Sequence, residues 1–197
     1  MSVLLVIGDD KFGHRLIGRM PSDWPGAIVL DRSSSFGRAV RLIRRGVLSW
    51  QVCFRMAWAD FWRRDIKVPP FPAIMSNQQL QCLIEQLDVR TVFLFRAGLI
   101  INRSILDMGV ELLNTHCARI PAYGGLGSIA RALADGAHNQ CATLHRVTER
   151  IDAGEVIDTE PYCLRSDWSY GRNEDVAYDA GIDVLLRNLT RVLRRAA

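Results

Sequence analysis

Short runs of continuous apolar residues recur along this chain, and segments with helical character separate them. Residues 3–7 form the first run and residues 27–30 the second, while residues 91–95 are rich in β-branched and aromatic side chains. A run without polar alternation predicts a strand that is buried on both faces. Strands of this kind that alternate with helices predict an α/β domain with a largely parallel central sheet and helices on both of its faces.

Caps, glycines and periodicity predict the remaining elements. Further strands are expected at residues 110–113, 142–147 and 155–163, and helices at about residues 11–20, 36–45 and 126–133. Asn77 is expected to cap a helix that ends near residue 87, and Asn173 to cap the last helix. That last helix should place one apolar stripe against the sheet, made of Tyr178, Ile182, Leu185, Leu189 and Val192.

Length and composition favour one domain that spans residues 1–197. A chain of 197 residues can bury one sizeable core, and 49% apolar with 23% charged residues is ordinary for a globular domain. The apolar start is too short for a signal peptide, and no stretch approaches the roughly 20 apolar residues of a membrane span. Five scattered cysteines without a CxxC pair predict reduced thiols, a cytoplasmic location and no bound metal.

A basic and aromatic segment interrupts the alternation of strands and helices. Between Arg32 and Lys67 the chain has eight arginines and one lysine but only two aspartates. Within it, residues 50–64 carry three tryptophans and two phenylalanines and predict an extra amphipathic helix. Such a segment can serve an anionic partner, either a phosphate, a nucleic acid or a membrane surface, or it can be a solvated helix face.

Two short polar stretches are candidates for chemistry. Asn114 and His116 follow the strand expected at residues 110–113, and alternation along an extended chain puts both side chains on the same side. An amide and an imidazole aimed at one spot can stabilise an oxyanion, although polar pairs at strand ends also occur without chemistry. Asp152 lies in a turn, where it either stabilises the turn or raises the pKa of a neighbouring histidine.

These stretches combine into a longer pattern. Asn-x-His is followed by a Pro-x-Tyr-x-Gly turn, a helix, Thr-x-His and then Asp-x-Gly, which here are Asn114, His116, Pro121, Tyr123, Gly125, Thr143, His145, Asp152 and Gly154. The pattern resembles the folate-dependent formyltransferase family, which includes glycinamide ribonucleotide formyltransferase, methionyl-tRNA formyltransferase and the sugar N-formyltransferases. The order of the motifs, the intervening helix and the 36-residue gap from His116 to Asp152 all agree, over roughly residues 88–160.

The resemblance implies a Rossmann-like formyltransferase fold, a formyl donor and a set of roles. The donor would be N10-formyltetrahydrofolate, and the acceptor a small-molecule amine. Asn114 and His116 would bind the formyl oxygen, while Asp152 would keep His116 protonated and help to remove the amine's proton. Backbone groups of two loops would hold the pterin; the matching residues are Leu99, Ile100, Ile105, Thr148, Glu149, Arg150 and Ile151.

Some positions depart from the family pattern or have a structural interpretation. Cys117 stands where the family usually has proline, and Gly124 where transfer-RNA and sugar enzymes often have arginine. These departures concern the acceptor side and leave the three chemical groups in place. Cys117 is interpreted as a packed thiol. His145 matches a family position and is interpreted as structural.

Elimination favours an amino sugar carried on a nucleotide as the acceptor. The Gly/Ser-rich phosphate loop of the ribonucleotide enzyme is missing, and Asp9 and Asp10 stand in its place. The chain is also expected to lack the extra carboxyl-terminal barrel of the transfer-RNA enzyme and the amino-terminal regulatory domain of formyl-folate hydrolases. Glycinamide ribonucleotide and an amino-acid or siderophore amine remain alternatives, as do a formyl-folate hydrolase and a non-catalytic nucleic-acid or membrane-surface binder. Nucleic acid is not the favoured partner, and the oligomeric state stays open.

Residues 50–64 have two competing interpretations. With a sugar nucleotide as acceptor, Arg63 or Arg64 would contact its diphosphate, and Trp58 or Trp62 would line the pocket for its base. Alternatively, the tryptophans pack onto the sheet while the arginines stay in water.

Overall fold

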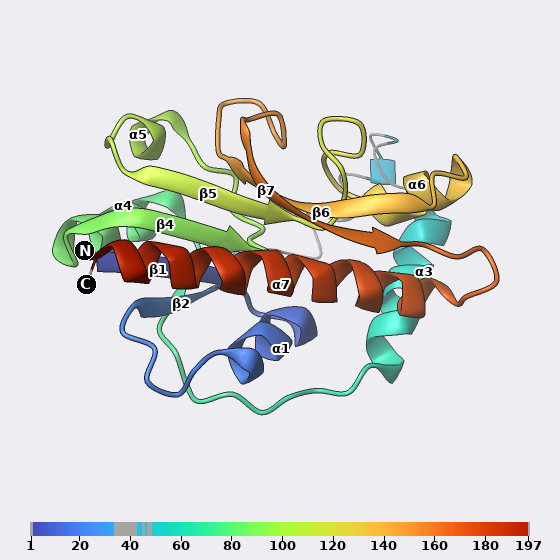
Figure 1. Ribbon diagram of the computed structural model, residues 1–197, viewed down its shortest axis with the longest axis horizontal. Helices are drawn as coiled ribbons and strands as arrows, with labels where there is room; N and C mark the ends of the chain where they lie inside the picture. The colour runs from blue at the N-terminus through green and yellow to red at the C-terminus, as the bar shows by residue number, and fades with distance from the viewer. Residues whose placement is uncertain (1, 34–42, 45, 47–48, 197) are drawn as a thin grey trace.

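A computed structural model of the protein describes residues 2–33, 43, 44, 46 and 49–196. In this part of the chain seven strands form one sheet with the order β3-β2-β1-β4-β5-β6-β7 (Figure 1). The strands are β1 (Ser2–Gly8), β2 (Ala27–Asp31), β3 (Ala73–Ile74), β4 (Val89–Phe95), β5 (Glu111–His116), β6 (Asn139–Arg146) and β7 (Val156–Cys163). Strands β1 to β5 pair in parallel, whereas β6 is antiparallel to both β5 and β7. The expected α/β fold with a largely parallel sheet is confirmed.

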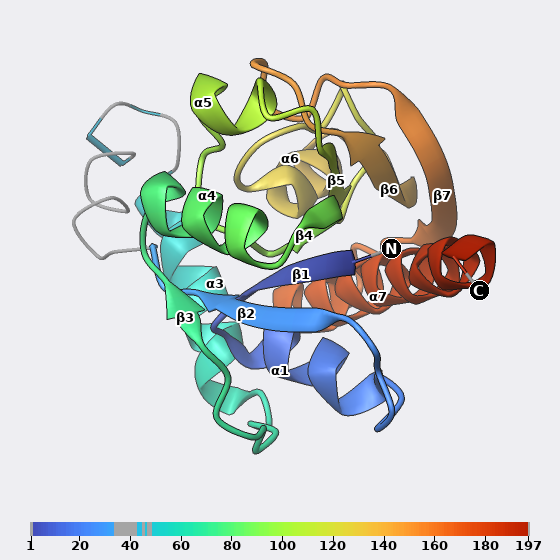
Figure 2. The same ribbon diagram turned by 90° about the vertical axis from the view of Figure 1, so that its left-hand side faces the viewer.

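Helices cover both faces of this sheet. The described helices are α1 (Lys11–Arg19), α3 (Trp50–Trp62), α4 (Asn77–Gln86), α5 (Arg103–Leu106), α6 (Ser128–Ala134) and α7 (Tyr170–Ala196). Figure 2 shows α4 and α5 on one side of the sheet and α1 and α7 on the other. Among the residues that the structure describes, no helix is both long enough and apolar enough to cross a bilayer.

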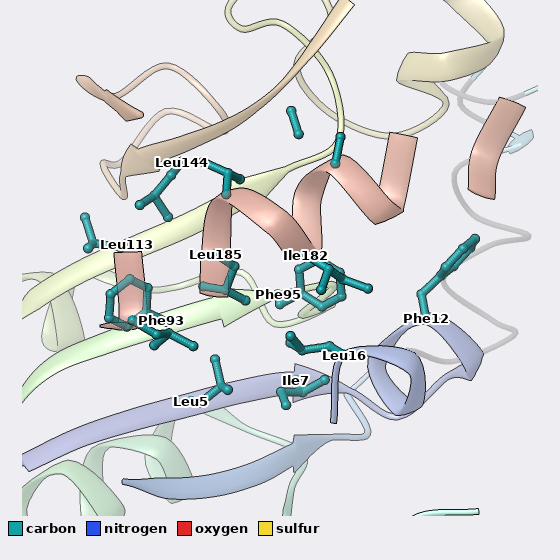
Figure 3. Packing of buried hydrophobic residues seen from close by; sticks show 14 of the residues in the cluster. Leu5, Ile7, Phe12, Leu16, Phe93, Phe95, Leu113, Leu144, Ile182 and Leu185 are labelled. Carbon is teal, nitrogen blue, oxygen red and sulfur yellow. The ribbon is translucent and has the colours of Figure 1, made fainter. Parts of the chain in front are cut away.

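The position of β1 between two helical layers explains why its sequence has no polar alternation. Leu5 and Ile7 point to the layer of α1 and α7, where they join Phe12, Leu16 and Leu185 (Figure 3). Leu4 and Val6 point to the other layer and pack with residues of α4, and all four side chains are fully buried or nearly so. At about 1.5–3 kcal/mol for each buried aliphatic side chain, burial on both faces makes this strand a main contributor to stability.

The stripe expected on the last helix is confirmed. Ile182, Leu185 and Leu189 are buried in the layer between α7 and the sheet, and Tyr178 and Val192 pack against it. The extra helix expected at residues 50–64 is present as α3. The helix expected at about residues 36–45 lies for the most part outside the described residues.

Two helix caps were wrongly predicted. Ser76 caps α4, because its hydroxyl accepts from the N–H of Gln79, while Asn77 instead donates to the carbonyl of Ile100. Helix α7 begins at Tyr170, and the buried Asn173 binds both backbone groups of Arg165 in the preceding loop. A short amide side chain can satisfy a neighbouring loop as well as a helix end, so sequence alone does not decide between these uses.

Candidate active site

Strand β5 carries the first two candidate residues within its own length. It runs to His116, three residues beyond the expected end, so Asn114 and His116 are part of the strand. Their partners across the antiparallel pair are His145 and Thr143 of β6. Residues two apart on a strand share a face. Both side chains accordingly reach the same residue, Asp152.

Asp152 lies at the centre of the cluster, on the loop between β6 and β7. Its Oδ1 lies 3.3 Å from Asn114 Nδ2 and 3.3 Å from His145 Nε2. Its Oδ2 lies 3.3 Å from His116 Nδ1 and accepts a 2.7 Å hydrogen bond from the backbone N–H of Gly125. The backbone of Asp152 is left-handed, with φ at 48°. The structure thus brings together the three residues that the sequence proposed for catalysis.

The surroundings of Asp152 keep its carboxyl group ionised. Burial by itself raises the pKa of Asp152, but the contacts with His145, His116 and the Gly125 N–H outweigh it and lower the pKa to about 2. A carboxylate with several donors is stabilised in its charged form. At neutral pH, Asp152 is therefore an anion held in place on both oxygens.

His116 has acceptors at both ring nitrogens. Nε2 donates to the carbonyl of Tyr123 at 2.8 Å, and Nδ1 faces Asp152. Burial lowers the pKa of His116, and Asp152 and the Tyr123 carbonyl, which both raise it, do not compensate. The direction of this shift is opposite to the expected one, in which Asp152 keeps His116 protonated at neutral pH. Neutral His116 carries its proton on Nε2, which leaves the Nδ1 lone pair beside Asp152 as a place where a proton can be taken up.

His145 belongs to the cluster more closely than the sequence suggested. It is 2% exposed, and its Nδ1 donates to the carbonyl of Arg146 at 2.8 Å. That bond directs Nε2 towards Asn114, 3.1 Å away, and towards Asp152. His145 is thus a positioning residue for the other members. The Thr-x-His motif could have predicted this role, because His145 lies across from Asn114 once β5 and β6 pair.

The loop before α6 is shaped to reach Asp152. An added Cβ at Gly124 would lie 3.0 Å from the Cβ of Asp152, so a side chain here would require a shift of a few tenths of an ångström. Gly125 has a φ of 76°, which turns its N–H towards the carboxylate. Gly124, which stands where transfer-RNA and sugar enzymes are expected to have arginine, thus allows a close approach of this loop to Asp152. Cys117 is buried 3.6 Å from the hydroxyl of Ser128, and burial raises its pKa, as expected for a packed thiol.

The two loops proposed for the pterin lie side by side. Arg103 at the start of α5 pairs with Glu149 at 2.8 Å, and Leu99 and Val147 pack against the same buried layer. The N–H of Leu99 donates to Asp31 at 2.8 Å, and Ile105 is fully buried beneath. Thr148 donates to the carbonyl of Arg150 at 3.1 Å. Ile100 and Ile151 are 57% and 64% exposed, so apolar side chains of both loops face outwards where a ring can lie.

Arg63, at the C-terminal end of α3, has a different role from either one expected. Its side chain is 5% exposed and pairs with Glu174 at 3.2 Å and with Asp175 at 3.0 Å. Its guanidinium also lies over the ring of Phe12, 4.0 Å from the centroid. Arg63 is therefore neither free for a diphosphate nor in water. The tryptophans of α3 do not pack onto the sheet either, because Trp50, Trp58 and Trp62 are 57–69% exposed.

Comparison with known proteins agrees with the site. The pattern of the formyl transferase family matches residues 67–165, which is half of the chain and includes Asn114, His116 and Asp152. The chain belongs to this family. Methionyl-tRNA formyltransferase from Syntrophomonas wolfei is 29% identical over 112 residues, or 56% of this chain and 36% of that protein. The same enzyme from Staphylococcus aureus is 24% identical over 130 residues, covering 66% and 42%. The matches thus span well under half the length of these curated relatives.

Solved structures show the same fold. Phosphoribosylglycinamide formyltransferase from Bacillus halodurans aligns with a TM-score of 0.68 at 14% identity, over 100% of this chain and 97% of that one. A Mycobacterium tuberculosis protein thought to be a sugar N-formyltransferase gives 0.67 at 16%, over 96% and 67%. A formyltetrahydrofolate deformylase from Pseudomonas syringae gives 0.66 at 19%, over 95% and 59%. At these identities the likeness establishes the Rossmann-like formyltransferase fold.

Proposed function

We propose that this protein transfers the formyl group of N10-formyltetrahydrofolate to a primary amine. The observation that carries the proposal is the convergence of Asn114, His116 and His145 on the ionised Asp152, within a fold and family of formyl transferases. A buried anion surrounded by an amide and two imidazoles serves proton transfer and oxyanion stabilisation, the two needs of acyl transfer.

The chemistry has one bond exchange and one proton transfer. The amine nitrogen attacks the formyl carbon, the C–O double bond opens to an oxyanion, and the bond to the folate N10 then breaks as the carbonyl re-forms. The amine loses a proton and N10 gains one, so atoms and charges balance without an oxidant or a metal. The protein must therefore hold an oxyanion and carry a proton between two nitrogens.

The cluster supplies both the carrier for the proton and the donors for the oxyanion. The amine's proton moves, directly or through water, to Nδ1 of His116, where Asp152 stabilises the imidazolium at 3.3 Å. The Nε2–H of the imidazolium then exchanges the Tyr123 carbonyl for the oxyanion, and the amide of Asn114 donates to it as well. Charged donors are the strongest in a site with little water. Asn114 Nδ2 donates to Asp152 and faces His145, so it exchanges a partner when the formyl oxygen arrives.

The folate would lie against the two loops that Arg103 and Glu149 join. Outward-facing Ile100 and Ile151 provide apolar surface for the pterin, and the backbone groups of residues 148–151 provide its hydrogen bonds. A pocket made of backbone groups recognises a heterocycle with few distinctive side chains. Dissociation constants in the micromolar range, about −8 kcal/mol, are expected.

For the acceptor we propose an amino sugar carried on a nucleotide. The end of β1, where a phosphate could bind at the start of α1, is occupied by the chain's own carboxylate: Asp10 accepts from the N–H groups of Phe12 and Gly13 and pairs with Arg96. This filled helix start argues against a ribonucleotide phosphate at that place.

Calorimetry with 5-formyltetrahydrofolate, followed by assays with amine panels, tests the proposal. We expect folate binding, and formamide formation with nucleotide-linked amino sugars ahead of glycinamide ribonucleotide and free amino acids. No heat and no thermal stabilisation at millimolar folate would contradict formyl transfer itself. Formate release without an acceptor would instead establish a hydrolase, and turnover of another amine would correct only the acceptor.

A further inference from the structure

Helix α3 turns its large apolar side chains away from the protein. Trp50, Phe54, Trp58, Phe61 and Trp62 are all between 57% and 72% exposed. At 3.6 residues per turn, these five positions fall within an arc of about 120° on the helix surface. We call them the aromatic face of α3. A contiguous exposed apolar patch of this kind marks an interaction surface.

The opposite side of α3 attaches the helix to the body of the protein. Ala59 meets Gly171 of α7, where an added Cβ would lie 3.1 Å from that of Ala59. Lys11 donates to the carbonyls of Asp60 and Arg63 at the C-terminal end of the helix, at 2.5 and 2.9 Å. The buried pair of Arg63 with Glu174 adds a further attachment. These contacts hold the helix with its aromatic face directed outwards.

Four of the five rings of the aromatic face contact one another. The centroids of Phe54 and Trp58 are 6.2 Å apart, those of Trp58 and Trp62 5.9 Å, and those of Phe61 and Trp62 5.3 Å. The last two pairs meet edge to face. These four rings therefore form a continuous surface, and edge-to-face packing covers part of the ring faces on which bases would stack. This arrangement favours a broad apolar medium over a nucleic acid.

The charges around this face are predominantly positive. Arg55 and Arg64 are exposed on and beside the helix, and Arg172 is exposed across a groove of about 820 Å³ that Phe54, Trp58 and Trp62 line together with α6 and the start of α7. Asp60 and Asp65 are exposed here too, but Asp60 pairs with Lys11 and Arg63, and Asp65 with His14. Arg172 stacks on Trp168, 3.9 Å from its ring centroid. Two copies of this chain that met through α3 would bring these cations together. The charge pattern thus favours an anionic partner over self-association.

We propose that the aromatic face of α3 docks on the surface of an anionic phospholipid bilayer. Tryptophan and phenylalanine would lie at the level of the headgroups, and the flanking arginines would contact lipid phosphates, as in helices that lie in the plane of the interface. Figure 1 shows α3 beyond the ends of β4 and β5, at the end of the sheet where β5 finishes at His116. Docking would therefore bring the catalytic end of the domain close to the membrane.

Vesicle flotation with the whole chain tests this surface. We expect the protein to float with vesicles of phosphatidylglycerol and phosphatidylcholine at least tenfold more than with phosphatidylcholine alone, and less as salt is raised. Three of the five tryptophans lie on the aromatic face, so their emission should shift to the blue on binding.

Matched variants separate the aromatic face from other exposed groups. Trp58→Ala with Phe61→Ala should lower vesicle binding at least tenfold, whereas Leu87→Ala, another exposed apolar side chain, should leave it unchanged. Arg55→Glu with Arg64→Glu should lower binding to anionic vesicles, and Arg90→Glu, a matched charge change on β4, should affect it much less. Folate binding should be the same in all of them.

Several results would overturn the proposal. They are the absence of flotation with either vesicle type, flotation that the α3 variants do not change, an α3-dependent dimer in light scattering, and tighter binding to single-stranded RNA or to nucleoside diphosphates than to vesicles. Folate calorimetry is measured independently, so none of these results bears on formyl transfer.

Discussion

Polar side chains are usually exposed and large apolar ones buried, and the catalytic cluster and helix α3 depart from this distribution in opposite ways. In the cluster, charged and polar groups are buried: His145 and Asp152 have side chains that are 3% and 9% exposed, and each finds partners inside the protein. On α3, the large aromatic side chains are exposed, whereas Arg63 at its end is buried and pairs with Glu174. Buried polar groups and exposed apolar patches are the informative departures from the ordinary pattern. The buried polar groups of the cluster depend on partners within this chain, whereas the exposed aromatic residues of α3 call for a partner outside it.

The buried arginine should give the largest effect on stability. Arg63→Met leaves Glu174, whose side chain is 4% exposed, without its main partner, so the free energy of unfolding should fall by about 3–5 kcal/mol. Burial already raises the pKa of Glu174 although Arg63 lowers it, and the variant should raise it further. The raised pKa adds stability at low pH that is lost as the pH rises, so the deficit should be smaller at pH 4 than at pH 8. Denaturant unfolding at both pH values measures it, with the exposed Arg64→Met as a control expected within about 0.5 kcal/mol of the parent.

The central carboxylate should give the largest effect on activity. Asp152→Asn removes the anion that stabilises a protonated His116, and formyl transfer should fall roughly 10²-fold or more, about 2.7 kcal/mol. The asparagine can still accept from the N–H of Gly125, so the fold should survive. Steady-state kinetics and circular dichroism measure both. Full activity of this variant at neutral pH would exclude the proposed proton path.

His145 should have a smaller effect with a specific pH signature. His145→Ala removes a contact that lowers the pKa of Asp152, so that pKa should rise above about 2 and turnover should fall about tenfold, 1.4 kcal/mol. A depressed carboxyl pKa provides stability above pH 4 that is lost as the pH falls towards 2, so the variant should unfold at a higher pH during acid titration. Carbon NMR of the carboxyl groups follows the shift. His145→Gln retains an N–H donor and should recover part of the loss, which a purely packing role would not predict.

The pKa of His116 can be measured directly and tests its proposed role as a proton acceptor. Burial lowers its pKa and Asp152 raises it, so proton NMR should show His116 titrating below 6.5, and lower still in Asp152→Asn. In the parent enzyme, kcat/KM should rise with pH as His116 loses its proton and becomes able to accept one. An imidazole that titrates above 6.5 would instead support a cation in the resting enzyme.

The smallest effect is expected on the aromatic face of α3. Trp58 is 57% exposed, and Trp58→Ala removes few contacts with the body of the protein. The free energy of unfolding should change by less than about 0.5 kcal/mol, and formyl transfer to a soluble acceptor should be unchanged. Thermal and denaturant unfolding measure the first and kinetics the second. A loss of several kcal/mol would mean that this face is covered by the chain itself, and the contrast with the catalytic cluster would disappear.

Much of the fold could be read from local patterns. Continuous apolar runs predicted the buried strands, and helical periodicity predicted the stripe on α7, because a residue's burial follows from the period of its element. The catalytic candidates Asn114, His116 and Asp152 came from the resemblance of their motifs to the formyltransferase family, and the structure places Asn114 and His116 each against Asp152. The same reasoning misassigned the caps at Asn77 and Asn173, because a side-chain amide binds whichever backbone groups the tertiary fold brings near.

The sequence by itself determined the periods of the strands and helices, the identity of the chemical groups and the presence of a basic aromatic segment. Only the tertiary structure decided three further matters. It placed His145 against Asp152, buried Arg63 between α3 and α7, and turned the aromatic residues of α3 outwards. The first depends on the pairing of β5 with β6, which sets His145 against Asn114, 31 positions away. The second depends on the contact of Arg63 with Glu174, 111 positions away, and the third on the rotation of a helix relative to the sheet. Local sequence gives the period of a helix, but the packing of the whole chain decides which of its faces meets the protein.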